Sequence, residues 1–212
     1  ELGMSLADKG YEVHFISSAL PARLDITNPN IFFHKVNVQT YPLFQYQPYD
    51  IALSSMIYRV VNLYKLDLLH AHYAIPYAYA AFTAKQMLKE EGKDIPLVTT
   101  LHGTDITLVG QHPSYKHAVE FSINQSDTIT SVSESLKKDT LQFFKITKDI
   151  QVITNFISNA IKYSPNTDKI IVRVERVEEN VQFSVQDFGI GMPEDKKDKV
   201  FEQYYRVSGD EQ

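Results

Sequence analysis

The sequence predicts an α/β fold in which a doubly wound parallel sheet is followed by a smaller α/β unit. Through residue 153, short apolar segments alternate with segments of helical periodicity, as in a parallel sheet that carries helices on its faces. After residue 169, two alternating strands lead into a glycine-containing loop. The stretch between them, residues 151–165 (QVITNFISNAIKYSP), fits the end of the first pattern and the start of the second.

Composition excludes several classes of function. The chain has 212 residues, no cysteine and a formal net charge of −5. Without cysteine there are no disulfides and no thiolate metal ligands, which fits a reducing compartment, so we predict a cytoplasmic location. The acidic balance gives no basic footprint for nucleic acid, and no apolar run approaches the ~20 residues that cross a bilayer. We expect neither a nucleic-acid partner nor a membrane segment.

The first elements follow from local signals. The chain starts at helical spacing, and Gly10 is placed to end that helix. Alternation predicts strands over 11–16 and 31–38. An aromatic, proline-containing loop over 41–49 follows, and a helix is expected from Asp50, as its N-cap, to Lys65.

The next segment, 66–72 (LDLLHAH), is mostly apolar and predicts a strand buried on both faces of the sheet. Continued alternation of apolar runs and helical periodicity predicts the rest of this part. The expected elements are a helix over 76–90 that closes at Gly92, a strand over 96–101, a helix over 114–123, a strand over 127–132, a helix capped by Ser133 and a strand over 149–153.

Polar residues follow several of these strands, and ligands of open parallel sheets bind beyond the carboxyl ends of the strands. Neutral His102 can donate a hydrogen bond to a ligand hydroxyl, although a histidine in such a loop is often structural. His70 and His72 occupy alternate positions of an expected buried strand, so we interpret them as core groups with satisfied hydrogen bonds. The candidate positions are Ser17, Ser18, 70–73 and 100–105.

Four long segments carry a family likeness: LHAHYAIPYAYAAFTAKQML, VTTLHGTDITLVG, FSINQSDTITSVSESLKKDT and QVITNFI. In this order they resemble the N-terminal half of retaining GT-B glycosyltransferases of family 4, above all members that join N-acetylglucosamine from UDP-N-acetylglucosamine to L-malate in bacillithiol synthesis. The resemblance implies a Rossmann-like domain over 1–154 without a cofactor. The family's first strand, its glycine-rich turn and its C-terminal donor-binding domain have no counterpart in this sequence.

The resemblance also implies roles for individual residues. His102 becomes the catalytic candidate, in contact with the donor sugar, while Tyr73 and Thr100 lie near the malate. Thr104 and Asp105 shape the loop, with a helix N-cap as the alternative for Asp105. Because glycosyl transfer depends on positioning both substrates, we expect no turnover by this chain.

Residues 155–165 have helical periodicity, with a polar face suited to magnesium and phosphate or simply to solvent. Two alternating strands follow over 170–177 and 181–186, and then the sequence DFGIGMP. A carboxylate at a strand end can accept a hydrogen bond from an adenine amino group, and glycines let the backbone approach a ligand. A plain turn is the alternative explanation.

NFISNAIKYS, DFGIGMP and VFEQYYRV resemble the N box, first glycine box and F box of the ATP-binding domain of sensor histidine kinases, the GHKL fold. The resemblance implies a partial α/β sandwich over 155–212 that binds Mg–ATP. The sequence has no second glycine box after these motifs and no phosphoacceptor motif before them, so we expect weak ATP binding at most. The implied contacts are Asn159 to magnesium; Asn155, Lys162 and Tyr163 to phosphate and nucleotide; Asp187, Gly189 and Gly191 to adenine; and Phe201 and Arg206 in the lid.

Three hypotheses follow: a glycosyltransferase-derived domain, the ATP-binding module of a two-component kinase, or a chimeric chain with neither activity. The two family patterns conflict over residues 150–153, where the first requires a strand and the second a helix. Only one of them can form, and such local conflict works against clean folding.

Overall fold

The computed structural model describes residues 2–39, 42, 46–153, 160, 164, 167, 169–177, 180–189 and 191. The helices are α1 (Leu2–Ala7), α2 (Tyr49–Tyr64), α3 (Tyr79–Glu90), α4 (Thr104–Thr107), α5 (Pro113–Gln125) and α6 (Glu134–Phe143), with a π-helical turn η1 (Ala74–Ala78) and a 3-10 turn η2 (Val109–Gln111). The strands are β1 (Val13–Ser17), β2 (Ile31–Lys35), β3 (Leu69–His72), β4 (Leu97–Leu101), β5 (Thr128–Ser131), β6 (Ile150–Val152), β7 (Ile171–Val177) and β8 (Asn180–Gln186).

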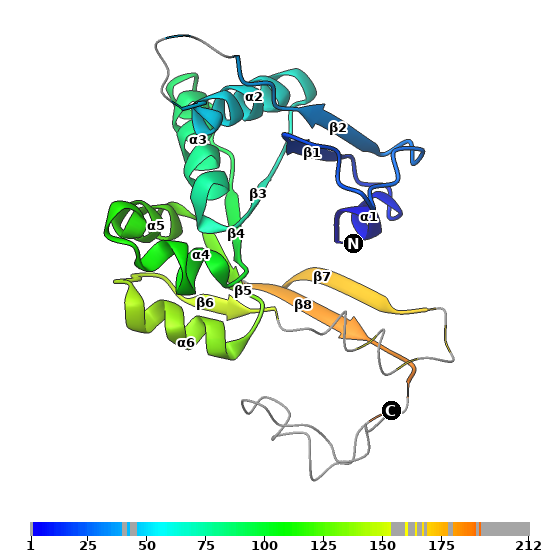
Figure 1. Ribbon diagram of the computed structural model, residues 1–212. Coiled ribbons are helices and arrows are strands. Elements are labelled where there is room, and N and C mark those ends of the chain that lie inside the picture. The colour runs from blue at the N-terminus through cyan, green and yellow to red at the C-terminus, as the bar shows by residue number, and fades with distance from the viewer. Residues whose placement is uncertain are drawn as a thin grey trace.

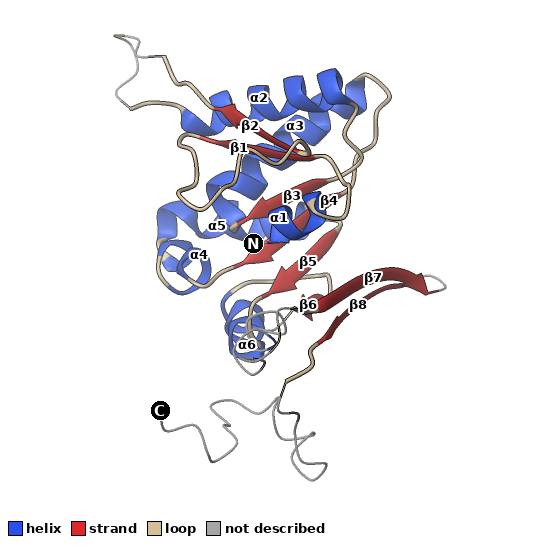
Figure 2. Ribbon diagram, turned by 90° about the vertical axis from the view of Figure 1, so that its right-hand side faces the viewer, coloured by secondary structure: helices blue, strands red, loops and turns tan. Residues whose placement is uncertain are grey.

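The strands before residue 153 are all parallel, as predicted, but within the described residues they form two sheets instead of one. β1 pairs with β2, and a four-stranded sheet follows in the order β3-β4-β5-β6. β7 and β8 form a separate antiparallel pair, which confirms the two strands expected there. Figure 2 shows the three groups, with β1 and β2 near the top, β3 to β6 below them, and β7 and β8 at the lower right.

Helices α2, α3 and α5 lie along one side of the strands, with α1 on the other (Figure 1). One hydrophobic cluster joins α2, α3, β3 and β4, and a second joins α5, α6 and strands β4 to β6. Leu53, Leu88 and Ile129, among the largest fully buried side chains, are at most 1% exposed. Burial of one such side chain contributes about 1.5–3 kcal/mol. This packing holds the sheet in a fixed position beneath the loops that follow its strands.

Two expectations were wrong in detail. Helix α2 begins at Tyr49 with Pro48 as its N-cap, so Asp50 lies within the first turn and does not cap the helix. Its carboxylate there still faces the positive end of the helix dipole. The strand expected over 66–72 is only β3, and it is buried on one face: Leu69 and Ala71 are buried while the alternate histidines are exposed.

Other local signals were confirmed. The Ser133 side chain accepts a hydrogen bond from the backbone N–H of Leu136 at 3.1 Å and caps α6. Gly10 and Gly92 follow α1 and α3 with φ of 91° and 79°. Glycine adopts this left-handed backbone without the steric cost that other residues carry.

At the start of the 151–165 stretch, the strand pattern forms and the helical one does not. β6 pairs with β5 through the register Ile129↔Ile150, and the backbone N–H of Ile153 donates to the carbonyl of Ser131 at 3.0 Å. Ala160, further along, is helical and 2% exposed. The conflict over 150–153 is therefore resolved in favour of the parallel sheet, whose hydrogen bonds come from β5.

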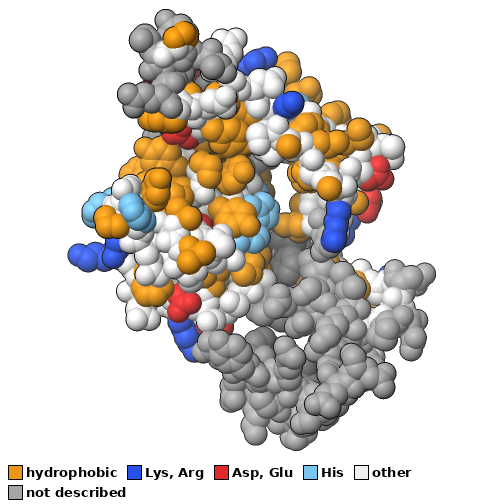
Figure 3. Space-filling view, in the orientation of Figure 1, with side chains coloured by type: hydrophobic (Ala, Val, Ile, Leu, Met, Phe, Trp, Pro, Cys, Tyr) orange, Lys and Arg blue, Asp and Glu red, His pale blue; other side chains and the backbone are white. Residues whose placement is uncertain are grey.

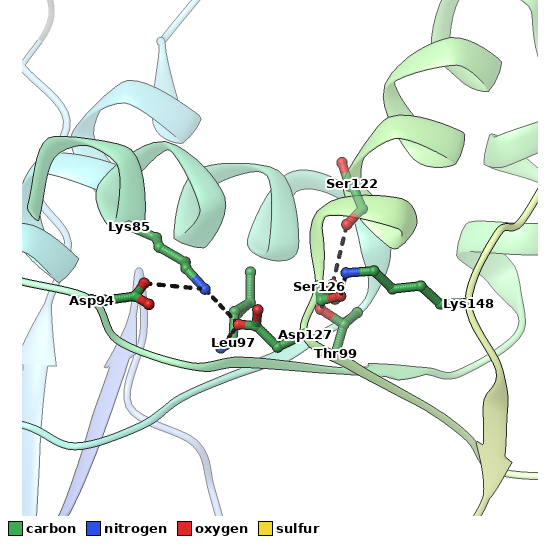
Figure 4. Close-up of polar contacts among 8 residues, drawn as sticks. All are labelled: Lys85, Asp94, Leu97, Thr99, Ser122, Ser126, Asp127 and Lys148. Carbon is green, nitrogen blue, oxygen red and sulfur yellow. Dashed lines mark hydrogen bonds and ion pairs between the residues drawn. The ribbon is translucent and has the colours of Figure 1, made fainter. Parts of the chain in front are cut away.

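A polar cluster ties together the amino ends of β4 and β5 (Figure 4). The Asp127 carboxylate accepts hydrogen bonds from Nζ of Lys85 and from the backbone N–H of Leu97, each at 2.6 Å. Burial by itself raises the pKa of Asp127, but these two bonds together with the charges of Lys85 and Lys148 outweigh it, so the pKa is lowered. Thr99 and Ser126 add a buried hydroxyl–hydroxyl bond of 2.7 Å. The cluster fixes the alignment of β4 with β5, and the opposite end of β4 carries part of the candidate site.

Candidate functional site

The register of β3 and β4 brings the residues after both strands together. His72 is level with Thr100, and the backbone N–H of Tyr73 donates to the Thr100 carbonyl at 2.9 Å. The rings of Tyr73 and His102 consequently lie with their centroids 4.6 Å apart, both half-buried. Figure 3 shows histidine side chains beside the hollow near the centre of the molecule. Two of the predicted site residues thus form one surface at the carboxyl end of the sheet.

Asp105 holds the loop after β3 and the loop after β4 in place. Its side chain is buried, with 3% of the residue exposed. Oδ2 accepts from the backbone N–H of Ala74 at 2.8 Å, and Oδ1 accepts from Gly103 at 3.0 Å and, more weakly, from His102 at 3.4 Å. One carboxylate therefore joins the loop after β3 to the loop after β4. The alternative of a helix N-cap was wrong, because Gly103 is the N-cap residue of α4.

Tyr73 has an unusual backbone. Its φ of 74° and ψ of 142° lie in a region that residues with a side chain rarely adopt. Such a conformation costs on the order of 1–3 kcal/mol and persists only where the surrounding structure enforces it. Here the enforcing contacts are the bond from Tyr73 to Thr100 and the Asp105 bond to the next residue, Ala74. In this strained conformation the Tyr73 ring packs against the His102 ring.

His70 and His72 are not core groups, contrary to the interpretation of the sequence, because both lie on an exposed face of β3. Both project from the face of β3 opposite to buried Leu69 and Ala71. The rings of His70 and His72 stack, with centroids 4.6 Å apart. Nδ1 of His72 lies 2.8 Å from Nε2 of His102 and forms a hydrogen bond with it. The site is therefore a row of three histidines rather than one.

Thr100 and Thr104 differ in exposure: the first is buried and the second is exposed. Thr100 is 2% exposed, and its hydroxyl bonds with Nε2 of His70 and with the Thr130 hydroxyl, each at 2.7 Å. It therefore supports the histidine row from beneath. Thr104 is exposed at the first position of α4, next to the loop that carries His102. Of the two threonines, Thr104 is the one with side-chain surface open to a ligand.

The environment keeps all three histidines neutral near pH 7. Burial, followed by the neighbouring His70 and His102, lowers the pKa of His72 to about 4. Burial and then His102 lower the pKa of His70, while burial lowers the pKa of His102 against the opposing effect of Asp105. The His70 and His72 rings keep exposed edges, yet the protein atoms around them remove enough water to disfavour the charged form. Each ring therefore offers one N–H donor and one nitrogen acceptor.

Within the described residues, no group of three or more histidine, cysteine or acidic side chains is arranged to hold a metal ion. Over the same residues, no helix has the length and apolar character needed to cross a membrane.

Part of the second predicted site can also be placed. Asp187 is exposed and follows β8, and its Oδ1 accepts from the backbone N–H of Gly189 at 3.0 Å and from the Ser164 hydroxyl at 3.4 Å. Gly191 has a φ of 69°, with no atom within 4 Å of where a Cβ would lie. Asp187 and Gly189 thus form a tight turn, and the backbone at Gly191 is open to approach. The other predicted residues, Asn155, Asn159, Lys162, Tyr163, Phe201 and Arg206, lie outside the described residues.

The sequence did contain a signal for the role of His72. Histidines at alternate positions of a strand project from one face, and a parallel neighbour with a histidine just beyond its end can bring a third one level with them. Recognising this needs the β3–β4 register, in which His72 pairs with Thr100, two residues before His102. The interpretation of His70 and His72 as core groups assumed a strand covered on both faces, which β3 is not.

Comparison with protein families gives two matches. Residues 1–160 match the model of Glycosyltransferase Family 4. Residues 147–212 match the model of the histidine kinase-, DNA gyrase B- and HSP90-like ATPases. The two matches overlap over residues 147–160, which include most of the 151–165 stretch that fits both sequence patterns.

Individual relatives repeat this division. The chain is 50% identical over 163 residues to N-acetyl-alpha-D-glucosaminyl L-malate synthase of Bacillus anthracis, covering 77% of this chain and 42% of that protein. It is 31% identical over 129 residues to adaptive-response sensory kinase SasA of Rippkaea orientalis, covering 55% of this chain and 33% of the kinase. It is 45% identical over 62 residues to sensor histidine kinase WalK of Bacillus subtilis, covering 28% of this chain and 10% of the kinase. The chain thus spans less than half the length of each of these three relatives.

Proposed function

The chain belongs to glycosyltransferase family 4, and on that premise we propose that its first 154 residues bind the substrates of a hexosyl transfer. The proposed acceptor is L-malate and the transferred sugar N-acetylglucosamine, both of which appear in the name of the Bacillus anthracis relative. The proposed donor, UDP-N-acetylglucosamine, is the one that the family resemblance implies. We also propose a cytoplasmic location, which the absence of cysteine supports.

One observation carries the proposal: Tyr73 and His102 meet at the carboxyl ends of β3 and β4, with their rings 4.6 Å apart. Ligands of open α/β sheets bind beyond these ends. The strained backbone of Tyr73 supports a functional reason for its position, since strain of this kind concentrates at binding and catalytic sites.

The chemistry of the surface suits malate, a small dianion that requires hydrogen-bond donors. Neutral His102 supplies an N–H, and the hydroxyls of Tyr73 and Thr104 supply two more. Hydrogen bonds to charged groups contribute about 1.5–3 kcal/mol each, so loss of one donor weakens binding measurably. In this proposal Thr100 and Asp105 act indirectly, by holding the histidine row and the two loops.

Titration calorimetry with L-malate and with UDP-N-acetylglucosamine tests the proposal. We expect His102→Ala to weaken malate binding about tenfold or more, the value of one hydrogen bond to a charged ligand. His117→Ala is the matched control, because His117 is exposed on α5 and makes none of the contacts described for the site, so the affinity should be unchanged. Absence of heat with both ligands, or equal affinities in wild type and His102→Ala, would contradict the proposed function.

We further propose that residues 155–212 bind Mg–ATP, supported by the ATPase family match over 147–212 and by the turn at Asp187. In that site Asp187 accepts a hydrogen bond from the adenine amino group, beside Gly189 and Gly191. Asn159 contacts magnesium, while Asn155, Lys162 and Tyr163 contact phosphate and nucleotide. Phe201 and Arg206 belong to the lid.

Calorimetry with Mg–ATP separates this second site from the first. Asp187→Asn keeps an oxygen that can accept from Gly189 but loses the carboxylate, so we expect the turn to remain and ATP binding to fall about tenfold. Removal of magnesium with EDTA should lower the heat further, because hard oxygen ligands and phosphates hold that ion. Unchanged ATP affinity in Asp187→Asn would refute the assignment. If neither malate, UDP-sugar nor ATP binds, the inactive chimera is the correct description.

A further inference from the structure

We propose that His72 is a positioning residue for His102: its Nδ1–H donates to Nε2 of His102, so that His102 presents its Nδ1–H to the ligand. The inference rests on the proposed function for its ligand, L-malate, but the hydrogen-bond arrangement itself can be tested without any ligand. Its starting point is the distance of 2.8 Å between Nδ1 of His72 and Nε2 of His102.

A hydrogen bond between two neutral imidazoles fixes both tautomers at once. One of the two facing nitrogens carries the proton and the other must be bare, because a neutral ring holds a single N–H. If His72 donates, the proton of His102 is on Nδ1, and if His102 donates, its Nδ1 is bare. Among the described residues, no group bonds Nδ1 of His102, so this nitrogen is left for a ligand. A dianion requires a donor there, which selects the arrangement in which His72 donates.

The neighbouring network explains why His72, and not His70, has this role. The Thr130 hydroxyl lies 3.4 Å from the Thr99 carbonyl, to which it can only donate. The Thr100 hydroxyl then donates to Thr130 at 2.7 Å, and Nε2–H of His70 donates to Thr100 at 2.7 Å. His70 is thereby committed to the sheet, and it meets His72 only by stacking at 4.6 Å. His72 alone links the row to His102.

The surroundings hold this pair in place from three sides. His72 lies between the stacked ring of His70 and the His102 ring, whose centroid is 5.1 Å away. The Tyr73 ring also packs against His102, with centroids 4.6 Å apart, and Asp105 fixes the backbone of the His102 loop. Both rings are neutral near pH 7, in line with their lowered pKa values. The pair therefore has no net charge, and one N–H proton lies in the hydrogen bond between the rings. Whether His102 offers an N–H or a bare nitrogen to the ligand therefore depends on His72, which need not touch the ligand itself.

Nitrogen-15 NMR of the histidine rings in the full chain tests the proposal directly. We expect His102 in the wild type to show the shifts of a single Nδ1–H tautomer. His72→Leu removes the donor, so His102 should shift to a mixture of tautomers, and malate affinity should fall about tenfold. His72→Asn is the conservative control, because the asparagine amide reaches the position of histidine Nδ1. It should restore both the single tautomer and most of the affinity.

The outcomes separate this inference from the proposed function. Averaged tautomers of His102 in the wild type, or an unchanged tautomer and affinity in His72→Leu, would overturn the role of His72. If His72→Leu does not fold, the wild-type spectrum and the His72→Asn variant still decide the question. If the wild type binds no malate but shows the single tautomer that His72→Asn preserves, the positioning role stands and the choice of ligand is wrong. If His102→Ala weakens malate binding and His72→Leu does not, the proposed function stands without His72.

Discussion

Replacing Asp105 by alanine is expected to lower the free energy of unfolding by about 2–6 kcal/mol, because each buried backbone N–H left without an acceptor costs about 1–3 kcal/mol. Two strong bonds are lost, from Ala74 at 2.8 Å and from Gly103 at 3.0 Å, and Ala74 is completely buried. Urea denaturation followed by circular dichroism measures the change.

Two further variants make the Asp105 prediction specific. Asp67→Ala removes an exposed carboxylate before β3 and should change the free energy of unfolding by less than about 0.5 kcal/mol. Asp105→Asn keeps one of two acceptor oxygens, so we expect an intermediate loss of stability. If Asp105→Ala is as stable as Asp67→Ala, the two loops are held by other contacts and the carboxylate is not their common anchor.

The same substitution also separates stability from binding. Asp105 is buried and its carboxylate contacts backbone groups on both loops, so we expect no direct contact between it and the proposed ligand, malate. Conditions in which Asp105→Ala is still folded should nevertheless show weaker malate binding, because Tyr73 and His102 lose their common anchor. Asp105→Asn should recover affinity and stability together. Recovery of stability without recovery of affinity would instead point to direct contact between the carboxylate and a ligand.

Elements whose signals are local were predicted well from the sequence. Ser133 caps α6, Gly10 and Gly92 end their helices, and the alternation of strands and helices gave the parallel arrangement. These depend on residues within a few positions of one another, so the amino-acid order contains the information. The N-cap of α2 was missed because Asp50 and Pro48 are both plausible at a helix start, and the structure places Pro48 there.

The candidate site was predicted only as a set of positions. His102 and Tyr73 were expected at strand ends, and the structure brings them together. The hydrogen bond from His72 and the Asp105 link between loops join residues about 30 positions apart. Such contacts depend on the strand register and on which face of β3 is covered. The apolar run 66–72 suggested cover on both faces, and hydrophobicity alone cannot tell one buried face from two.

Residues 150–153 show how tertiary contacts decide between two local patterns. The sequence there suits a strand or the start of a helix, and the strand forms because β5 offers a ready edge, with Ser131 level with Val152. A short apolar segment has no strong preference of its own, so the available hydrogen-bond partners select its structure. The ATPase match begins at residue 147, and its first residues are therefore part of the glycosyltransferase-like sheet.

Gly110→Ala is expected to be the second strongly destabilising substitution, with a loss of about 3 kcal/mol, at the upper end of the usual cost of overpacking. A Cβ at Gly110 would lie 2.2 Å from the Asp105 carbonyl oxygen and 2.9 Å from Cζ of Phe144. The Phe144 ring can rotate away, but the carbonyl belongs to the backbone of α4. The overlap can therefore be relieved only if α4 shifts, and the Asp105 carboxylate shifts with it.

Gly92→Ala provides the control for Gly110→Ala, because it adds the same methyl group where no atom lies within 4 Å but φ is 79°. The left-handed backbone alone should cost about 1–2 kcal/mol there. Thermal unfolding of both variants, and of Gly110→Ala combined with Phe144→Leu, separates the contributions. The double variant should regain only the part due to Phe144 and should still bind malate more weakly than the wild type, because the overlap with the α4 backbone remains. Full recovery of stability and affinity would show that the methyl group at Gly110 does not displace the backbone of α4, and so does not disturb the histidine row.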